Sequence, residues 1–213
     1  MKTKVALSFT LISALLLMSG CASTSNYKKA DSTSDSLEAT AQIVNQSNLQ
    51  AGVVTKELKS LLESPSQNIR PQFEKFDSAV SKLDTLTKDL YVRSTSIQSK
   101  GADYFTSWDE DLATIRNEDI RSRSAERRQT MAARFEEVRI SYEKVKTELT
   151  LFVSNLKDIR TVLATDLTTD GLGSLKDTAE DSGERAKQLE KTLGHLEVEF
   201  RDLSASMSTT THY

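Results

Sequence analysis

Cys21 is the only cysteine in the 213 residues, and its position indicates that its thiol is covalently modified. Two lysines precede an apolar run over residues 5–18, and two small residues separate that run from Cys21. This order is typical of an export signal, and the run is shorter than the roughly 20 residues that span a bilayer as a helix. We therefore expect residues 1–20 to be a signal peptide that is removed.

The tetrad MSGC, residues 18–21, resembles the lipobox of bacterial lipoproteins, with Met18 in place of the usual leucine. The resemblance implies that Cys21 becomes the first residue of the mature chain and carries acyl chains such as palmitate. Three such chains would hold a protein in a membrane far more firmly than one. Ala22 replaces the aspartate that would imply the inner membrane, so the resemblance implies the outer membrane, facing the periplasm. The alternative is a secreted protein with a free thiol.

Side chains suited to catalysis or metal binding are few and scattered. The only histidines are His195, which lies beside the apolar stripe of its segment, and His212 near the C-terminus. A di-metal helical bundle would need two Glu-x-x-His motifs, and no serine lies in a nucleophile elbow or a glycine-rich phosphate loop. We expect no enzymatic activity, no cofactor and no metal.

The segment DLTTDGLGSLKD, residues 166–177, matches a twelve-residue calcium loop only in part. Thr168 stands where the loop needs Asp or Asn, and Asp177 stands where it needs a bidentate Glu. Helix capping by Asp170 or Ser174 accounts for the same residues. We expect no calcium site.

The composition favours helices held together by packing alone. The chain has two prolines, seven glycines and 6% aromatic residues, and a single cysteine cannot form a disulfide within the chain. It has 28 basic and 31 acidic side chains, a net charge of −3, and loss of residues 1–20 would remove two of the positive charges. Such a balance gives no general attraction to nucleic acid, so we expect no nucleic-acid partner.

Apolar residues spaced by threes and fours predict an all-α protein, an elongated antiparallel four-helix bundle. A capping-box pattern, DSLE, begins the first helix at Asp35. Pro65 and Pro71 mark the first turn, and the glycines of DLTTDGLGS mark the third. We predict a lipidated flexible tether, four helices in one bundle and a disordered tail: 21–34; 35–63, 71–116, 118–165 and 173–207; and 208–213.

The boundary between the second and third helices lacks proline and glycine. We predict a turn at Asn117, because the apolar stripe shifts by about one residue between Ile115 and Ile120 and an uninterrupted helix would be unusually long. The outer helices are shorter than these two, so the pair should project as a two-helix coiled-coil arm over about residues 100–131. In this hairpin an acidic segment faces a basic one: Asp103, Asp109, Glu110 and Asp111 opposite Arg121, Arg123, Arg127 and Arg128.

The arm contains the residues that we consider most suited to contact a partner. Its candidate contact residues are an aromatic group and a set of arginines: Tyr104, Phe105, Trp108, Arg121, Arg123 and Arg127. Exposed aromatic side chains can anchor a partner or lie at a membrane interface. The alternative is structural, with Phe105 and Trp108 covering the seam of the arm and the arginines forming ordinary surface ion pairs.

The segment YFTSWDEDLATIRNEDIRSRSAERR, residues 104–128, resembles a family of uncharacterised bacterial lipoproteins with a helical, coiled-coil-rich domain of unknown function. The resemblance covers about residues 37–205 and implies a cell-envelope location without an established activity. It rests on an aromatic pair, a tryptophan followed by an acid, and polar residues at helical intervals: Tyr104, Phe105, Trp108, Ile115, Asn117, Glu118, Arg121, Ser124 and Arg127.

These features favour a non-enzymatic envelope lipoprotein, anchored in the membrane by its N-terminal lipid, that acts as a scaffold or adaptor for a periplasmic protein partner. An alternative is a lipoprotein that binds lipid or peptidoglycan in grooves beside the first helix, where Thr40 and Ser47 occupy seam positions. Homo-oligomerisation through the long heptad stripes is a further expectation.

Overall fold

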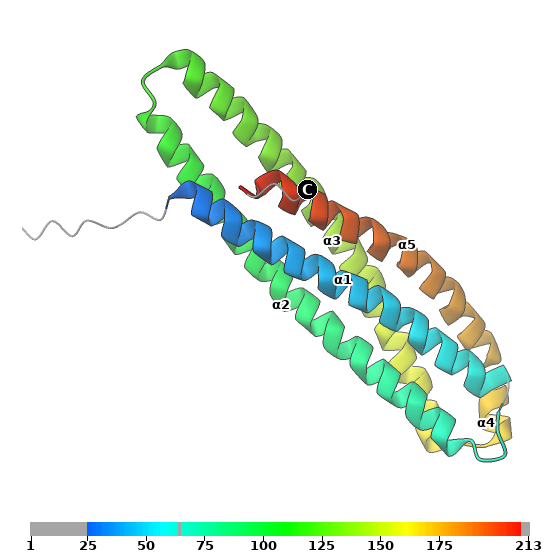
Figure 1. The fold of residues 1–213 in the computed structure, drawn as a ribbon. Coiled ribbons are helices and arrows are strands. Elements are labelled where there is room, and N and C mark those ends of the chain that lie inside the picture. The colour runs from blue at the N-terminus through cyan, green and yellow to red at the C-terminus, as the bar shows by residue number, and fades with distance from the viewer. Residues whose placement is uncertain (1–24, 64, 210–213) are drawn as a thin grey trace, which may run out of the picture.

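The structure is a computed structural model that describes residues 25–63 and 65–209. These residues contain five helices and no strand, so the predicted all-α class is confirmed. Four long helices run alternately up and down in an elongated bundle, and a short fifth lies at one end (Figure 1). The helices are α1 (Asn26–Glu63), α2 (Arg70–Thr114), α3 (Glu118–Thr165), α4 (Thr169–Gly173) and α5 (Lys176–Met207).

The bundle has a square cross-section in which each long helix packs on two others. Helix α1 packs on α2 and α5, and α3 packs on the same two helices. The apolar stripes read from the sequence meet inside, and each fully buried side chain contributes roughly 1.5–3 kcal/mol to the free energy of folding. The largest of them are Phe76, Phe152, Phe200, Leu37, Leu58, Leu61, Leu83, Leu90, Leu149, Leu156, Ile159 and Leu163.

The polar seam of α1 is satisfied within the bundle. Thr40 and Ser47 each donate a hydrogen bond to a carbonyl of their own helix, at 2.7 and 2.8 Å. Gln50 donates across to the carbonyl of Ala79 on α2 at 3.0 Å. The hydroxyls of Thr40 and Ser47 therefore have hydrogen-bond partners without any ligand.

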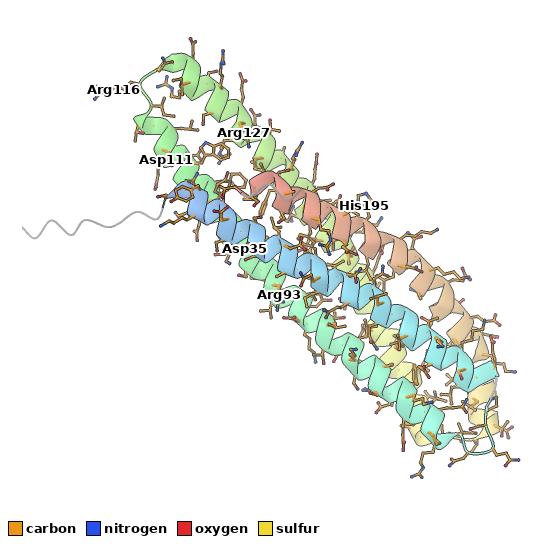
Figure 2. All side chains as sticks on the ribbon, in the orientation of Figure 1. Asp35, Arg93, Asp111, Arg116, Arg127 and His195 are labelled. Carbon is orange, nitrogen blue, oxygen red and sulfur yellow. The ribbon has the colours of Figure 1, made fainter. Side chains whose placement is uncertain are left out.

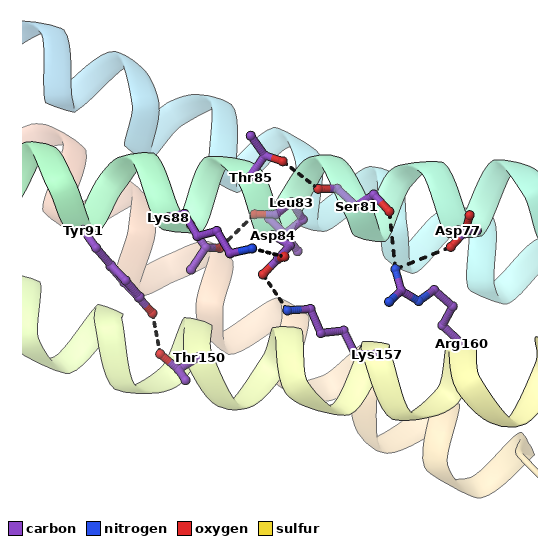
Figure 3. Close-up of polar contacts among 11 residues, drawn as sticks. Asp77, Ser81, Leu83, Asp84, Thr85, Lys88, Tyr91, Thr150, Lys157 and Arg160 are labelled. Atoms are coloured by element: carbon purple, nitrogen blue, oxygen red, sulfur yellow. Dashed lines mark hydrogen bonds and ion pairs between the residues drawn. The ribbon is translucent and has the colours of Figure 1, made fainter.

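Charged residues join α2 and α3 along the outside of their seam (Figure 3). Asp84 accepts from Lys157 of α3 at 2.7 Å and pairs with Lys88 of its own helix at 2.9 Å. Desolvation raises the pKa of Asp84, but the two lysines together lower it below its usual value. Such partly exposed pairs each contribute about 0–1 kcal/mol. They therefore add little to the stability of the bundle, and their main effect is on the register of α2 against α3.

The N-terminal boundary differs from the prediction. Helix α1 begins at Asn26 rather than at Asp35, because Ala30, Thr33 and Ser34 are buried in the bundle instead of forming a tether. The rest of the predicted tether, the signal peptide and Cys21 lie outside the described residues, as do residues 210–213 of the predicted tail.

The other boundaries lie close to the predicted ones, apart from α4. Helix α3 has the predicted bounds, and α2 ends at Thr114 rather than at 116. The predicted fourth helix, 173–207, corresponds to α5, which begins at Lys176, and the short α4 lies in the segment that was predicted to be a break. Thr209, in the predicted tail, donates from its backbone and its hydroxyl to Asp31 at 3.0 and 2.9 Å.

Candidate functional site

Helices α2 and α3 continue beyond the ends of α1 and α5 as an isolated pair (Figure 1). Tyr104 and Met131 are buried, and no residue between them is. We call residues 105–130 the arm. The arm lacks a core of its own, so most of its surface is free to contact something else.

The turn at the end of the arm is formed by local interactions. Ile115 and Asn117 have extended backbones that close α2 and open α3. The Asn117 side chain accepts from the backbone N–H of Ile120 at 3.1 Å, which is an N-cap. Glu118 and Asp119 follow in the first turn of α3, where the helix dipole favours acids. The predicted turn at Asn117 is confirmed.

Aromatic rings close the base of the arm. Phe135 of α3 meets Phe105 of α2 edge to face at 5.7 Å between ring centroids. The Tyr104 ring lies 5.4 Å from that of Trp108. The Trp108 indole donates to Ser124 Oγ at 3.0 Å and so joins the two helices of the arm. These contacts support the alternative in which Phe105 and Trp108 cover the seam.

Among the described residues of the arm, one ion pair with an N–O distance within 4 Å joins α2 to α3. Arg128 pairs with Asp109 at 2.8 Å, and its guanidinium lies 5.2 Å from the centroid of the Phe105 ring. Arg121 instead pairs with Glu118 on its own helix. The expected general pairing of an acidic with a basic segment therefore reduces to the Arg128–Asp109 pair.

The six candidate contact residues divide by exposure. Tyr104 is 7% exposed, so it belongs to the core, and burial raises its pKa although the nearby Arg127 cation opposes that shift. Phe105, Trp108 and Arg121 are half-buried. Arg123 and Arg127 are exposed and have no ion pair among the described residues (Figure 2 labels Arg127). The exposed arginine flank, not Tyr104, is thus the part available to a partner.

A second feature is an open groove of about 620 Å³ between the start of α1 and the middle of α2. It lies beside the first helix, as the sequence had suggested, and its lining includes Thr40 but not Ser47. Part of the lining comes from the segment that was predicted to be a tether. Lys100 donates to Ser36 Oγ at 2.6 Å across this groove. Its lining combines cations, carboxylates and hydroxyls: Lys28, Asp31, Ser32, Asp35, Ser36, Ala39, Thr40, Arg93, Ser96 and Lys100.

An apolar pocket lies in the core near the base of the arm. It is lined by Phe135, Tyr142 and Phe200 and has a volume of about 10 Å³, about the least that a water molecule needs. This pocket has no room for an acyl chain.

The residues weighed as metal ligands do not come together. Among residues 25–63 and 65–209, no group of three or more His, Cys, Asp or Glu side chains could hold a metal ion. His195 is exposed beside Glu199 at 3.4 Å, and His212 lies outside the described residues. In the calcium-like segment, Thr168 caps α4 by accepting from Gly171 N at 3.1 Å, so the cap is Thr168 rather than Asp170 or Ser174.

A search for membrane-spanning helices over the described residues finds none that is long and apolar enough.

A family model described as "Protein of unknown function (DUF2959)" matches residues 21–205. This match confirms the resemblance to an uncharacterised family and extends it from residue 37 to residue 21. No curated protein and no solved structure matches the chain.

Proposed function

Because the chain belongs to the DUF2959 family, whose function is unknown, we propose its role from its own geometry. It is a non-enzymatic lipoprotein of the bacterial cell envelope, anchored by acyl chains on Cys21 in the outer membrane and facing the periplasm. There it acts as a scaffold or adaptor that binds a protein partner through the flank of its arm.

The observation that carries this proposal is the arm itself. No residue between Tyr104 and Met131 is buried, so the segment adds little to the stability of the bundle. Arg123 and Arg127 lie there without ion pairs to any described residue, and arginine is enriched at protein interfaces. A helical pair that presents unpaired cations suits an acidic surface on a partner.

The lipid anchor is supported by the sequence before α1. The family match begins at residue 21, the cysteine that the lipobox resemblance makes the first mature residue. Mass spectrometry of the protein extracted from membranes should find the mature chain starting at Cys21 with acyl mass attached. A chain that begins elsewhere, or that lacks acyl mass, would refute the anchor.

Site-specific photo-crosslinking in whole cells tests the partner. A photoreactive residue in place of Arg127 should capture a discrete protein that is not captured from position 185, an exposed arginine on α5. Replacing Arg123 with Glu should abolish that capture, whereas Arg185→Glu should not. Equal capture from both positions would show that the arm has no selectivity.

The groove beside α1 supports a second candidate function, the binding of a polar envelope component such as a lipid headgroup or peptidoglycan. Its mixed charges and hydroxyls suit a ligand with both charged and hydroxyl groups, whereas the filled core gives no room for acyl chains. Native mass spectrometry of the protein from membranes should retain such a ligand, and Lys100→Ala should weaken its retention. An empty wild-type protein would remove this candidate.

A further inference from the structure

The position of the arm relative to the start of α1 limits how the molecule can face the membrane. Both the start of α1 and the end of α5 lie at the base of the arm (Figure 1). Lys29 of α1 donates to Ser107 of α2, which marks that level on the arm. The turn at Asn117 is ten residues further along the chain, so the arm extends about 15 Å beyond this level.

The connection to the anchor is short. Five residue steps separate Cys21 from Asn26, where α1 begins, so they reach at most roughly 16–18 Å. A tether that ran to residue 34 would have reached roughly 43–47 Å and would have left the orientation open. The early start of α1 reduces that freedom.

The arm cannot point directly away from a bilayer that holds Cys21. From Asn26, α1 runs away from the arm for 38 residues, about 57 Å. If the arm pointed away from the bilayer, α1 would have to enter it with exposed charged side chains such as Lys56 and Lys59, which is costly. With the arm toward the bilayer, the arm extends about 15 Å beyond the start of α1, and the connection from Cys21 reaches roughly 16–18 Å. The two lengths are similar, so the end of the arm can reach the membrane surface.

Resting on the proposed lipid anchor, we propose that the tip of the arm, residues 115–121, is a second membrane contact that lies in the phospholipid headgroup layer. Ile120 is 58% exposed at the tip, which leaves an apolar side chain open to its surroundings. Arg116 points away from the bundle at the tip (Figure 2) and has no ion pair among the described residues.

The chemistry of the tip fits this layer. Arg116 is exposed and outside any ion pair of the described residues, whereas Arg121 is paired with Glu118. Arginine binds lipid phosphates, while an apolar side chain such as Ile120 enters the boundary with the acyl chains. One exposed isoleucine and one unpaired arginine are too weak to bind a bilayer alone. The tip orients the anchored protein and leaves the arginine flank parallel to the membrane normal.

The test uses the full acylated protein in vesicles of phosphatidylethanolamine and phosphatidylglycerol with a quencher on some headgroups. A fluorophore is attached at Ala113→Cys, near the tip, or at Gln67→Cys, an exposed position in the connection between α1 and α2, with Cys21 blocked by its acyl chains. We expect strong quenching of the first label and none of the second.

Two isoleucines of α3 provide a matched pair of variants. Ile120 at the tip and Ile140 on the flank of the bundle are 58% and 57% exposed. Ile120→Glu should remove most of the quenching at position 113, whereas Ile140→Glu should leave it unchanged. Circular dichroism of both variants verifies that the helices remain.

The outcomes separate this inference from the lipid anchor on which it rests. A protein that carries acyl mass and floats with vesicles, but whose tip label is not quenched, overturns the inference and leaves the anchor. A protein without acyl mass on Cys21 overturns both. Quenching in native membranes but not in vesicles also overturns the lipid contact, because it assigns the tip to a membrane protein.

Discussion

The ring of Phe135 lies directly against the backbone of Gly101, so that a β-carbon on Gly101 would be only 2.3 Å from Phe135 Cζ. Absence of a side chain at this position of α2 allows the ring to fill the base of the arm, where it also meets Phe105. The glycine is therefore required by packing, although glycine in a helix interior is intrinsically unfavourable.

Gly101→Ala should destabilise the protein. The displaced ring should cost about 1–3 kcal/mol, which exceeds the roughly 1 kcal/mol that alanine gains in helix propensity. Gly194→Ala is the control, because nothing lies within 4 Å of a β-carbon there, and it should stabilise the protein slightly. Urea unfolding measures both. Equal effects would show that the Phe135 contact is unimportant.

Ser34 and Ser204 join α1 to α5 by reciprocal hydrogen bonds in a buried position. Each hydroxyl donates to the other residue's carbonyl at 2.9 Å. Replacing either serine with alanine should lower the free energy of unfolding by about 0.5–1.5 kcal/mol, since one buried hydrogen bond is lost while the carbonyl of Ser204 still accepts from Ser208 N. The double variant should lose less than the sum of the two single variants. Ser154→Ala, at an exposed position of α3, should have little effect.

Tyr142 makes the fold sensitive to alkaline pH. The residue is 3% exposed, and burial raises its pKa from 10.0 to about 12 although Ser94 opposes the shift with a hydrogen bond. The folded state thus holds the phenol proton more tightly than the unfolded chain. This contribution, about 3 kcal/mol, is complete below pH 10 and is lost as the pH rises toward 12.

Removing the Tyr142 hydroxyl should remove that part of the pH dependence. Between pH 10 and 12, Tyr142→Phe should lose less stability than the wild type, as measured by urea unfolding at both values. Tyr27→Phe serves as the control, because Tyr27 is 56% exposed. This variant should show the same pH dependence of stability as the wild type. Parallel curves for all three proteins would contradict the assignment.

The arm should open before the bundle unfolds. It contains no buried residue, and segments with few buried contacts open at low free-energy cost. Trp108, the only tryptophan, reports on the arm, so its fluorescence should change at a lower urea concentration than far-UV circular dichroism. Moving the tryptophan into the core with Trp108→Phe and Phe152→Trp should make the two transitions coincide. Coincident transitions in the wild type would mean that arm and bundle unfold together.

Part of the candidate site could be predicted from local sequence. The turn at Asn117 was predictable because its cap and the phase shift of the apolar stripe involve residues a few positions apart. Which aromatic residues are exposed was not predictable. Tyr104 and Trp108 share one face of α2. Helix α1 begins and α5 ends at the base of the arm, so that the bundle covers Tyr104 but not the next turn of α2. Tyr104 is therefore buried, while Trp108 is only half-buried.

The sequence by itself determined the helical class, the long antiparallel helices and the turn at the tip, because apolar spacing and caps act within a few residues. It also contains the lone cysteine on which the proposed anchor depends. Only the tertiary structure decided where α1 begins. The segment around Ser34 is polar and small, and it is helical because α5, 170 residues away, supplies its hydrogen-bond partners. That distant contact shortens the connection to Cys21, which is the premise of the proposed orientation of the arm.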